Sequence, residues 1–370
     1  MPTKEINIVS FNVPYPANYG GVIDVFFRIK ALKEMGVDVN LHTFTYGRPR
    51  SAELEALCKT VTYYKRHMGL ASILCRRPYI VQSRKNDGLA NNLQNSDAPI
   101  LLEGLHCCAM LEVLKGKKIF VRAHNVEHDY YHKLAEVESN PFKKAYYNID
   151  ARRLERYEPI LLQADGIFGV TEADCRHFQM MGCRNVWLMP SSHNHDEVIS
   201  RTGTGSYALY HANLSVPENI KAAHYLVDNI FSKTKHRLVI AGRSPHNDIR
   251  SKIVQYDNIS LVADPDDEEM DRLISEAQVS IMVTNQPTGL KLKLLNSLYA
   301  GRHCLVNSLM VSGTELGKVC TVADSVADQI EALDRLMQQP FTQEDIEKRK
   351  QLLGDRYSNR ANCRILVENI

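Results

Sequence analysis

The sequence predicts an α/β protein of two domains, each built on a parallel β-sheet. At 370 residues the chain is longer than one ordinary compact core, so two domains are expected. Short apolar runs alternate with stretches of helical periodicity, and this alternation restarts after residue 206. Polar, glycine-containing loops follow several apolar runs, as ligand-binding loops do at the carboxyl ends of parallel strands.

Composition excludes several classes of protein. Apolar residues at 44% and charged residues at 24% are ordinary for a globular protein, and a net charge of +2 gives no reason to expect a nucleic-acid partner. The nine cysteines include no C-x-x-C pair, so neither a zinc framework nor a redox motif is indicated. With no signal peptide and no apolar run of about 18–20 residues, a cytoplasmic protein is expected.

One segment is strongly basic. Between residues 56 and 86 there is no acidic residue, while lysines and arginines are interleaved with aromatic and aliphatic side chains. Such a segment can rest on an anionic membrane surface, which would give peripheral contact with the inner face of a membrane through residues 59–85. It can also be a solvated face beside a cleft for a negatively charged ligand.

The first half opens with a β-loop-α-β pattern. A strand is predicted at residues 6–11, a helix at 22–35 and a strand at 37–44, and the first loop contains Gly20 and Gly21. The dinucleotide fingerprint G-x-G-x-x-G is absent, so nicotinamide and flavin cofactors have little support. The two glycines either let a backbone approach a ligand closely or serve simple turn chemistry.

A polar cluster follows the strand predicted at residues 118–121. It contains Arg122, His124, Asn125 and Glu127, at the edge where open α/β sheets place ligands. A lone histidine is more often structural, but a position directly after a strand favours a functional His124. Glu127 either joins that site or caps the following helix.

A long helix is predicted to begin at Asn140 and Pro141. Its buried stripe is predicted to be Phe142, Tyr146, Ile149, Tyr157, Ile160 and Leu161. Further strands are predicted at residues 99–102 and 166–170, and residues 185–190 close the first half. The polar segment 191–206 indicates an inter-domain linker, and its His193, His195 and Asp196 are expected to be a chance cluster rather than a metal site.

The second half repeats the pattern and contains a candidate anion site. Strands are predicted at 207–211, 237–242, 259–262, 279–283 and 304–306, and helices at 220–231, 267–277 and 356–370. A short loop joins one of these strands to a helix closed by Gly301, with Lys291 and Lys293 in its first turn. A helix N-terminus offers free N–H groups, and lysines there are expected where a phosphate binds. The alternative is two solvated lysines.

Five segments, taken in order, resemble glycosyltransferase family 4, the retaining, metal-independent enzymes of the GT-B fold. They are residues 124–127 with Tyr130 and Tyr131, 164–167, 213–219, 238–243 and 283–301. The similarity is greatest to bacterial polysaccharide-type members that carry an R-x-H-N-V-E segment. The resemblance implies a GT-B fold, in which two Rossmann-like domains face each other across a ligand-binding cleft.

The resemblance also implies domain roles and an activity. Residues 1–200 would form an acceptor-binding domain and 206–355 a nucleotide-sugar-binding domain, with a terminal helix at 356–370 packing back on the first. The enzyme would transfer a hexose from a nucleotide sugar to a glycan or lipid-linked glycan acceptor, in surface polysaccharide or glycoconjugate synthesis. No metal is expected, and no cofactor other than the nucleotide-sugar co-substrate.

Each matched residue has an implied role. His124, Arg243 and Lys291 would be catalytic, with His124 at the transferred sugar and the cations at the departing nucleoside diphosphate. The acceptor side would comprise Arg122, Asn125 and Glu127. The donor-binding residues would be Gly20, Gly21, Asn213, Asn219, Gln286, Thr288, Gly289, Leu290, Lys293 and Asn296.

Four positions depart from the family pattern. The family usually has two glutamates, and here the first position falls at Gln286 or Asn285 and the second at Asn296. Asn213 and Asn219 stand where the family usually has an arginine and a lysine. Amide side chains can hydrogen-bond sugar hydroxyls but carry no charge. Two alternatives therefore stay open, a non-catalytic GT-B-fold binding protein and a GT-B-fold nucleotide-sugar epimerase. The sequence does not indicate the base, sugar, acceptor, linkage or oligomeric state.

Overall fold

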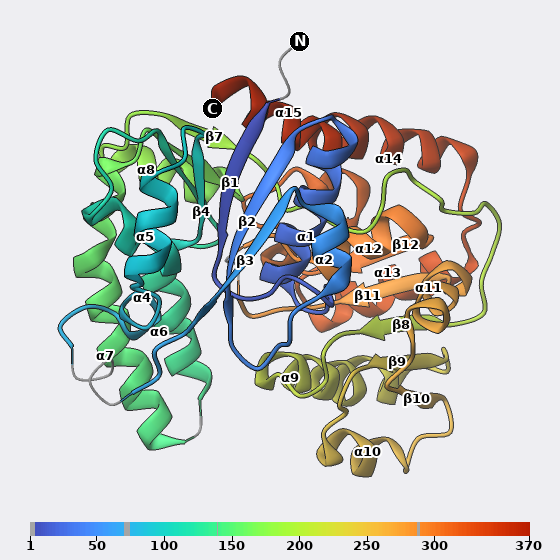
Figure 1. Cartoon of the computed structure of the whole chain (residues 1–370). Helices are drawn as coiled ribbons and strands as arrows, with labels where there is room; N and C mark the ends of the chain where they lie inside the picture. The colour runs from blue at the N-terminus through green and yellow to red at the C-terminus, as the bar shows by residue number, and fades with distance from the viewer. Residues whose placement is uncertain (1–3, 70–74, 139, 287–288) are drawn as a thin grey trace. The chain divides into compact units, whose positions relative to one another are not determined.

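Two parallel sheets, one in each half of the chain, form the scaffold of the protein (Figure 1). The computed structural model describes residues 4–69, 75–138, 140–286 and 289–370. The chain divides into unit 1, Met1–Asn194 with Asn359–Ile370, and unit 2, His195–Ser358. The division falls inside the segment 191–206, and each unit has its own sheet and its own hydrophobic core.

In the described residues of unit 1, seven strands lie in the order β3-β2-β1-β4-β5-β6-β7, and all pair in parallel. They are β1 (Glu5–Ser10), β2 (Asp38–Thr45), β3 (Thr60–Lys65), β4 (Ile100–Glu103), β5 (Ile119–Ala123), β6 (Gly166–Gly169) and β7 (Val186–Leu188). Alternate side chains face opposite cores, with Ile6 and Ile8 in one and Val9 in the other. The apolar character of both faces is that of a parallel sheet covered by helices on each side.

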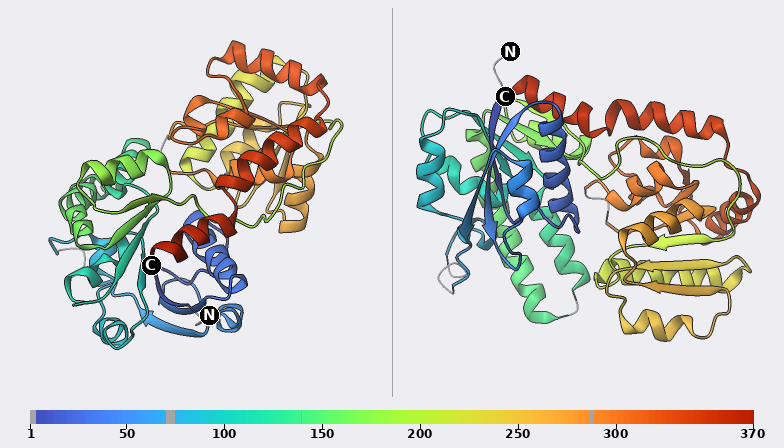
Figure 2. Two further views of the ribbon diagram at one scale, coloured as in Figure 1. Left: turned by 90° about the horizontal axis from the view of Figure 1, so that it is seen from above. Right: turned by 45° about the vertical axis from the view of Figure 1, so that its right-hand side comes forward.

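Helices cover both faces of the unit 1 sheet. One face carries α1 (Gly20–Glu34), α2 (Ala52–Leu57) and α15 (Asn359–Asn369). The remaining helices are α4 (Tyr79–Gln82), α5 (Asp87–Gln94), η1 (Leu105–Glu112), α6 (Glu127–Val137), α7 (Pro141–Tyr157), η2 (Glu158–Gln163) and α8 (Glu172–Met180). Helix α15 lies beside α1 (Figure 2), and the thiol of Cys363 donates to the carbonyl oxygen of Arg28 at 3.7 Å.

In the described residues of unit 2, six parallel strands lie in the order β10-β9-β8-β11-β12-β13. They are β8 (Ala208–His211), β9 (Leu238–Gly242), β10 (Ile259–Ala263), β11 (Val279–Met282), β12 (His303–Val306) and β13 (Thr321–Val322). The helices are α9 (Pro217–Tyr225), η3 (Leu226–Ile230), η4 (Phe231–Lys233), α10 (Asn247–Ile253), α11 (Asp267–Glu276), α12 (Leu292–Ala300), η5 (Ser308–Met310), η6 (Leu316–Val319), α13 (Val326–Gln338) and α14 (Gln343–Arg356).

A buried arginine fixes the end of α12. Arg349 of α14 is 2% exposed, and its guanidinium donates to the carbonyl oxygens of Leu298 at 3.1 Å and Gly301 at 2.6 Å. These carbonyls lie at the C-terminal end of α12, where a helix leaves acceptors unpaired and where a cation is favourable. Arg349 therefore ties α14 to the helix whose other end is the candidate anion site.

The strand order reverses once in each sheet. In unit 1 the reversal lies between β1 and β4, and in unit 2 between β8 and β11. Open parallel sheets bind ligands outside the carboxyl ends of the strands that flank such a reversal. The carboxyl ends of these four strands are therefore the expected positions of the functional groups.

The buried stripe predicted to begin at Phe142 is wrong for the first half of α7, whereas its last residue, Leu161, is buried as predicted. Phe142 is 85% exposed and Ile149 is 52% exposed. The helix instead buries Asp150, Ala151 and Leu154. The reason is that the first half of α7 packs on α6 rather than on the sheet, as the edge-on contact of Tyr147 with Tyr131 shows at 5.8 Å.

Other boundaries also differ from expectation. The helix predicted at 140–161 ends at Tyr157, and its last residues form the separate turn η2. The helix predicted at 220–231 begins earlier, at Pro217, because proline suits a first helical position. The terminal helix begins at Asn359, and residues 343–356 form α14.

The basic segment is partly built into unit 1. Residues 60–65 form the edge strand β3, and the buried Arg84 donates from Nε to the carbonyl oxygen of Phe11 at 2.8 Å. Arg77 forms an ion pair with Glu112. Residues 70–74 lie outside the described residues, and membrane contact through 59–85 stays a prediction. None of the helices that the structure describes is both long and apolar enough to cross a membrane.

A substitution at Gly242, the last residue of β9, tests how tightly the carboxyl end of the unit 2 sheet is packed. A Cβ there would lie 1.8 Å from the carbonyl oxygen of Ala212, so Gly242→Ala must displace backbone. We expect the unfolding free energy to fall by about 1–3 kcal/mol. Gly354→Ala in α14, where nothing lies within 4 Å of the added carbon, should instead gain up to about 1 kcal/mol. Urea unfolding followed by circular dichroism checks both, and equal effects would contradict the packing described.

Candidate active site

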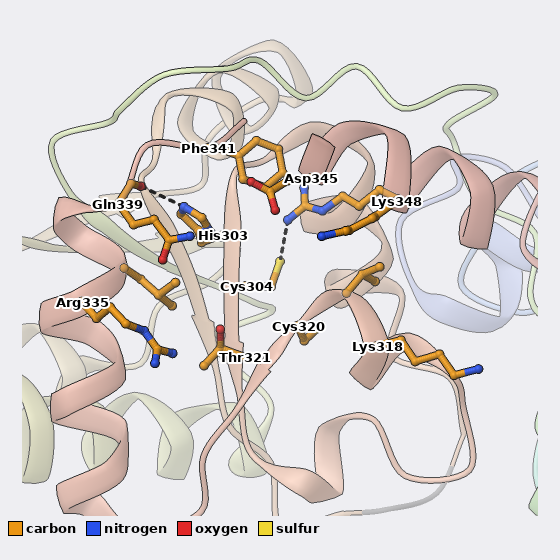
Figure 3. Close-up of a pocket in the computed structure, with 13 residues that line it drawn as sticks. His303, Cys304, Lys318, Cys320, Thr321, Arg335, Gln339, Phe341, Asp345 and Lys348 are labelled. Carbon is orange, nitrogen blue, oxygen red and sulfur yellow. Dashed lines mark hydrogen bonds between the residues drawn. The ribbon is translucent and has the colours of Figure 1, made fainter. Parts of the chain in front are cut away.

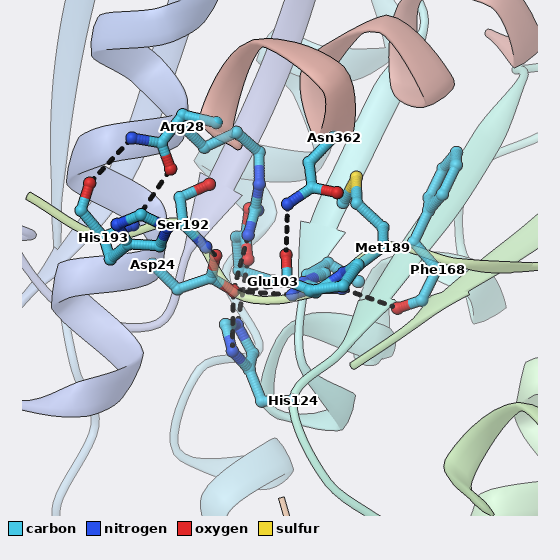
Figure 4. A network of polar contacts seen from close by, with 12 residues as sticks. Asp24, Arg28, Glu103, His124, Phe168, Met189, Ser192, His193 and Asn362 are labelled. Atoms are coloured by element: carbon cyan, nitrogen blue, oxygen red, sulfur yellow. Dashed lines mark hydrogen bonds and ion pairs between the residues drawn. The ribbon is translucent and has the colours of Figure 1, made fainter. Parts of the chain in front are cut away.

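In unit 1, three ionisable side chains meet beside the strand reversal. Glu103 is the last residue of β4, His124 follows the end of β5, and Asp24 comes from α1, which follows β1. The parallel sheet brings these residues together although they are up to 100 positions apart in the sequence. Figure 4 shows His124 pointing at both carboxylates.

His124 lies between the two carboxylates. Its Nε2 is 2.9 Å from Oε2 of Glu103, and its Nδ1 is 3.4 Å from Oδ2 of Asp24. The shorter contact fixes the ring through Nε2, and the longer one leaves Nδ1 less tightly engaged. His124 is 11% exposed, whereas Asp24 and Glu103 are at most 1% exposed, so His124 is the part of this network that reaches the surface.

Two buried guanidinium groups neutralise the carboxylates. Arg28 pairs with Asp24 at 2.6 Å and with Glu103, and Arg122 pairs with Asp24 at 3.1 Å. Burial alone would raise the pKa of Asp24, but Arg122 and Arg28 outweigh it and hold that pKa well below its usual range. Asp24, Glu103 and His124 lie close enough to hold a metal ion, but two arginines already supply the positive charge there.

The predicted acceptor-side residues fall in two environments. Arg122 is fully buried and donates to the carbonyl oxygen of Met189, so it holds Asp24 in place and does not reach the surface. Asn125 is half-buried, and Glu127 is buried in the first turn of α6. Burial, together with the charges of nearby carboxylates, raises the pKa of Glu127 to about 8, so this group is mostly protonated at neutral pH.

The two predicted glycines of unit 1 differ in their surroundings. A Cβ on Gly21 would lie 2.6 Å from the ring of Phe11, and that ring stands edge-on to His124 at 5.6 Å. Gly21 therefore lets α1 begin against a ring that borders His124. Gly20 has nothing within 4 Å of an added Cβ, which leaves its surface open.

In unit 2, the candidate anion site lies between the end of β11 and α12. Lys291 occupies the N-cap position of α12 and Lys293 its second position, and no acidic residue lies in the first turn. The sequence prediction of two lysines at this helix start is confirmed. Burial lowers the pKa of Lys293 to about 8, with Lys291 adding to the effect and Glu218 opposing it.

Hydrogen bonds join this helix start to the loop after β8. Lys293 Nζ donates to Oδ1 of Asn219 at 3.0 Å, and Asn219 Nδ2 donates to the backbone oxygen of Asn213 at 2.9 Å. The Lys293 ammonium also lies 5.4 Å from the centre of the Tyr210 ring. Three of the predicted donor residues are thus brought together at the strand reversal of unit 2.

Glu218 is a functional candidate that sequence reasoning missed. It accepts a short hydrogen bond from the hydroxyl of Thr284, the second residue after β11. A cavity of about 170 Å³ at the ends of β11 and β12 is lined by Glu218, Thr284, Asn285 and Asn307, among others. The signal in the sequence was an acidic residue directly after Pro217, at the start of a helix, where its charge is favourable.

The other predicted donor residues are less closely associated. Arg243 lies exposed at the end of β9, with Nη2 3.9 Å from Oδ1 of Asp267. Gly289 has a φ of 70°, a conformation that favours glycine. Gln286, Leu290 and Asn296 are half-buried in or beside this loop and helix, and Thr288 lies outside the described residues.

A larger cavity lies at the opposite end of the unit 2 sheet (Figure 3). It has a volume of about 300 Å³, and its lining includes His303, Cys304, Cys320, Arg335 and Asp345. His303 begins β12 and Cys320 precedes β13, so the cavity lies at the amino ends of these strands. Parallel sheets bind their ligands at the carboxyl ends, so we do not place the donor here.

The linker histidines are built into the fold individually. The backbone of His193 exchanges two hydrogen bonds with the side chain of Asn359. His195 stacks on Tyr299, with ring centres 5.4 Å apart and an angle of 6° between the planes.

The chain resembles known proteins in sequence and in fold. No protein-family model matches it. A Klebsiella pneumoniae protein, described as an uncharacterized 44.6 kDa protein in a cps region, is 26% identical over an alignment of 341 residues that covers 85% of this chain and 83% of that protein.

Solved glycosyltransferase structures match nearly the whole chain. The lipopolysaccharide outer core galactosyltransferase WaaB in its apo form gives a TM-score of 0.65 with 11% identity, over 99% of this chain and 98% of that chain. The α,α-trehalose-phosphate synthase (UDP-forming) from Burkholderia xenovorans, in complex with glucose-6-phosphate, gives a TM-score of 0.63 with 12% identity, over 99% of each chain.

The fold is that of GT-B glycosyltransferases. The α/β fold class predicted from the sequence is confirmed.

Replacing Asp24 tests the unit 1 charge network. Asp24→Asn keeps the shape but leaves Arg28 and Arg122 buried with one carboxylate fewer, so we expect a loss of about 3–5 kcal/mol in unfolding free energy. The fluorescence of Trp187, the single tryptophan of the chain and part of the unit 1 sheet, reports the unfolding in urea. Glu34→Gln, which removes an exposed partner of Lys30 on the same helix, should change stability by less than about 0.5 kcal/mol. A similarly small effect of Asp24→Asn would contradict the network.

The lowered pKa of Lys293 makes stability depend on pH. An unfolded lysine has a pKa near 10.5, so between about pH 8 and 10.5 the unfolded chain binds the extra proton. The wild type should therefore gain stability relative to Lys293→Met as pH rises through this window, by up to about 1.4 kcal/mol per pH unit. Urea unfolding at several pH values measures this difference. The exposed Lys350→Met is the control and should follow the wild type, and a Lys293→Met profile parallel to the wild type would refute the burial of the charge.

Proposed function

We propose that the chain is a glycosyltransferase related to family 4, which moves a sugar from a nucleotide-sugar donor to a glycan or lipid-linked glycan acceptor. The observation that carries this proposal is the group formed by Lys293, Asn219 and the start of α12 at the strand reversal of unit 2. A helix start with free N–H groups and cations beside it favours the binding of a diphosphate. The GT-B fold supplies the context, since its solved relatives include transferases.

The donor chemistry follows from charge. When the bond between the sugar and the diphosphate breaks, negative charge develops on the departing phosphate oxygen. We propose that the N–H groups at the start of α12, with Lys291, Lys293 and Arg243, stabilise that charge without a metal. Near pH 8 the amine of Lys293 is partly deprotonated. Binding of the anion would restore the proton, because an opposite charge favours the protonated amine.

The unit 1 network suits sugar hydroxyls. Glu103 holds His124 through Nε2, whereas the contact of Nδ1 with Asp24 is longer. We therefore propose that Nδ1 leaves Asp24 and forms a hydrogen bond with a hydroxyl of the transferred sugar. Asp24 and Glu103 would act as positioning residues. Retention of configuration and transfer of a hexose are proposed from the family resemblance.

The acceptor class has indirect support. One structural relative is a lipopolysaccharide galactosyltransferase, another is a UDP-forming enzyme that binds glucose-6-phosphate, and the K. pneumoniae relative comes from a cps region. These fit a role in surface polysaccharide or glycoconjugate synthesis at the inner face of a membrane. The proposed membrane contact is the basic segment 59–85.

A non-catalytic binding protein is the second candidate. Gln286 and Asn296 carry no charge where the family resemblance implies glutamates, which favours binding without turnover. Glu218 weighs against it, because it places a carboxylate beside Thr284 and within electrostatic reach of Lys293. An epimerase has less support, since carboxylates are sparse around this loop.

Turnover distinguishes these candidates. Purified protein incubated with UDP-, GDP- and ADP-sugars should hydrolyse one of them, with water taking the sugar in place of the acceptor and the nucleoside diphosphate released. His124→Ala and Lys291→Ala should each lower kcat by about 10²–10³, because each removes a group proposed to act on the transferring sugar or the leaving group. Lys350→Ala, an exposed lysine paired with Glu347, should keep full activity.

Thermal unfolding of each variant establishes that the fold is intact. Binding of a nucleotide sugar without turnover, unchanged in His124→Ala, would support the non-catalytic protein. Neither binding nor turnover with any nucleotide sugar would refute the proposed transferase.

A further inference from the structure

A second cluster in unit 1 has the composition of a transition-metal site. His128 comes from the first turn of α6, Glu158 begins η2, and His177 lies on α8. One potential ligand atom from each residue lies within 4.8 Å of the other two. These three residues lie on separate elements and show no recognisable spacing in the sequence, so the sequence does not indicate them as metal ligands.

The contacts converge on one carboxylate. Nε2 of His177 is 2.7 Å from Oε2 of Glu158, and Nδ1 of His128 is 3.4 Å from Oε1. Two ring nitrogens from different helices thus face the two oxygens of a single glutamate. Ligand atoms bound to one tetrahedral zinc ion at about 2.0–2.2 Å lie roughly 3.3–3.6 Å apart. The contact of His128 already has this spacing, and the hydrogen bond of His177 would open by less than about 1 Å to admit an ion.

The surroundings also fit a bound cation. Oδ1 of Asp129 lies 3.6 Å from Nε2 of His128, on the far side of that ring. Metal-bound histidines usually direct their other nitrogen to a carboxylate of this kind. The His177 side chain is 33% exposed, so an ion and a water ligand can reach the cluster from solvent.

The competing explanation is that Glu158 only forms ion pairs with His128 and His177, without a metal. It accounts for the hydrogen bond of His177 but leaves Nδ1 of His128 buried, with no hydrogen-bond partner that meets ordinary geometry. A cation between the three side chains would satisfy that nitrogen. In the described residues the ion pairs of Glu158 are those with His128 and His177, whereas Asp24 pairs with two guanidinium groups.

We propose that His128, Glu158 and His177 bind one divalent transition-metal ion, with Zn²⁺ as the best match for two imidazoles and a carboxylate. The ion would join α6, η2 and α8, and His128 directly follows Glu127, so it would fix the first turn of α6. The site is separate from the proposed donor site and takes no part in the sugar transfer.

Zinc binding to the full chain tests this proposal. After treatment with a chelator and its removal, isothermal titration with Zn²⁺ should give one ion per chain, and the ion should raise Tm. His177→Ala and His128→Gln should each weaken the affinity roughly tenfold or more. His132→Ala, on the same helix but outside the cluster, is the matched control and should bind as the wild type does.

Co²⁺ provides a second readout, because an ion bound in tetrahedral geometry absorbs visible light. This readout requires only that one of the two histidine variants folds. Loss of that spectrum in His177→Ala or His128→Gln, with the Tm of the metal-free protein retained, supports the site. Absence of a single tight site in the wild type would overturn the proposal. Equal loss in His132→Ala would also overturn it, because binding would then be non-specific. Either result leaves the proposed transferase untouched, since transfer is assayed without added metal.

Discussion

Every strand pair that the structure describes in the two sheets is parallel, and the placement of the functional groups depends on this constraint. Parallel strands bring all their carboxyl ends to one edge, so loops far apart in the sequence become neighbours. Asp24, Glu103 and His124 meet in this way in unit 1, and Asn219 and Lys293 meet in unit 2. The apolar runs that form the strands thus determine which polar residues can act together.

The two units use opposite electrostatics at these edges. In unit 1 the buried charges balance, because Arg28 pairs with both Asp24 and Glu103 and Arg122 pairs with Asp24. Within this network His124 is the residue that reaches the surface. A balanced, oriented group of this kind suits neutral hydroxyls. In unit 2 the helix start carries cations and no acidic residue in its first turn, which suits an anion.

The sequence predicted the elements that local periodicity determines, including the parallel strands and the lysines at the start of α12. It also located His124, because a polar residue directly after an apolar run is a local signal. Asp24 and Glu103 were not predicted as partners of His124, since their meeting depends on strand order, which one sequence does not reveal. Phe142 was wrongly placed in a core, because periodicity identifies an apolar face without showing what covers it. Glu218 was also missed, because its contact with Thr284 depends on strand order.

The measurement that tests the central claim most directly is the affinity of the chain for nucleoside diphosphates compared with the matching nucleosides. Isothermal titration with UDP, GDP and ADP, and with uridine, guanosine and adenosine, isolates the contribution of the diphosphate. We predict that one diphosphate binds roughly tenfold to a hundredfold more tightly than its nucleoside, and that Lys293→Gln removes most of this difference, because hydrogen bonds to charged groups contribute about 1.5–3 kcal/mol. Equal affinity for diphosphate and nucleoside, or an unchanged difference in Lys293→Gln, would contradict a diphosphate site at the start of α12.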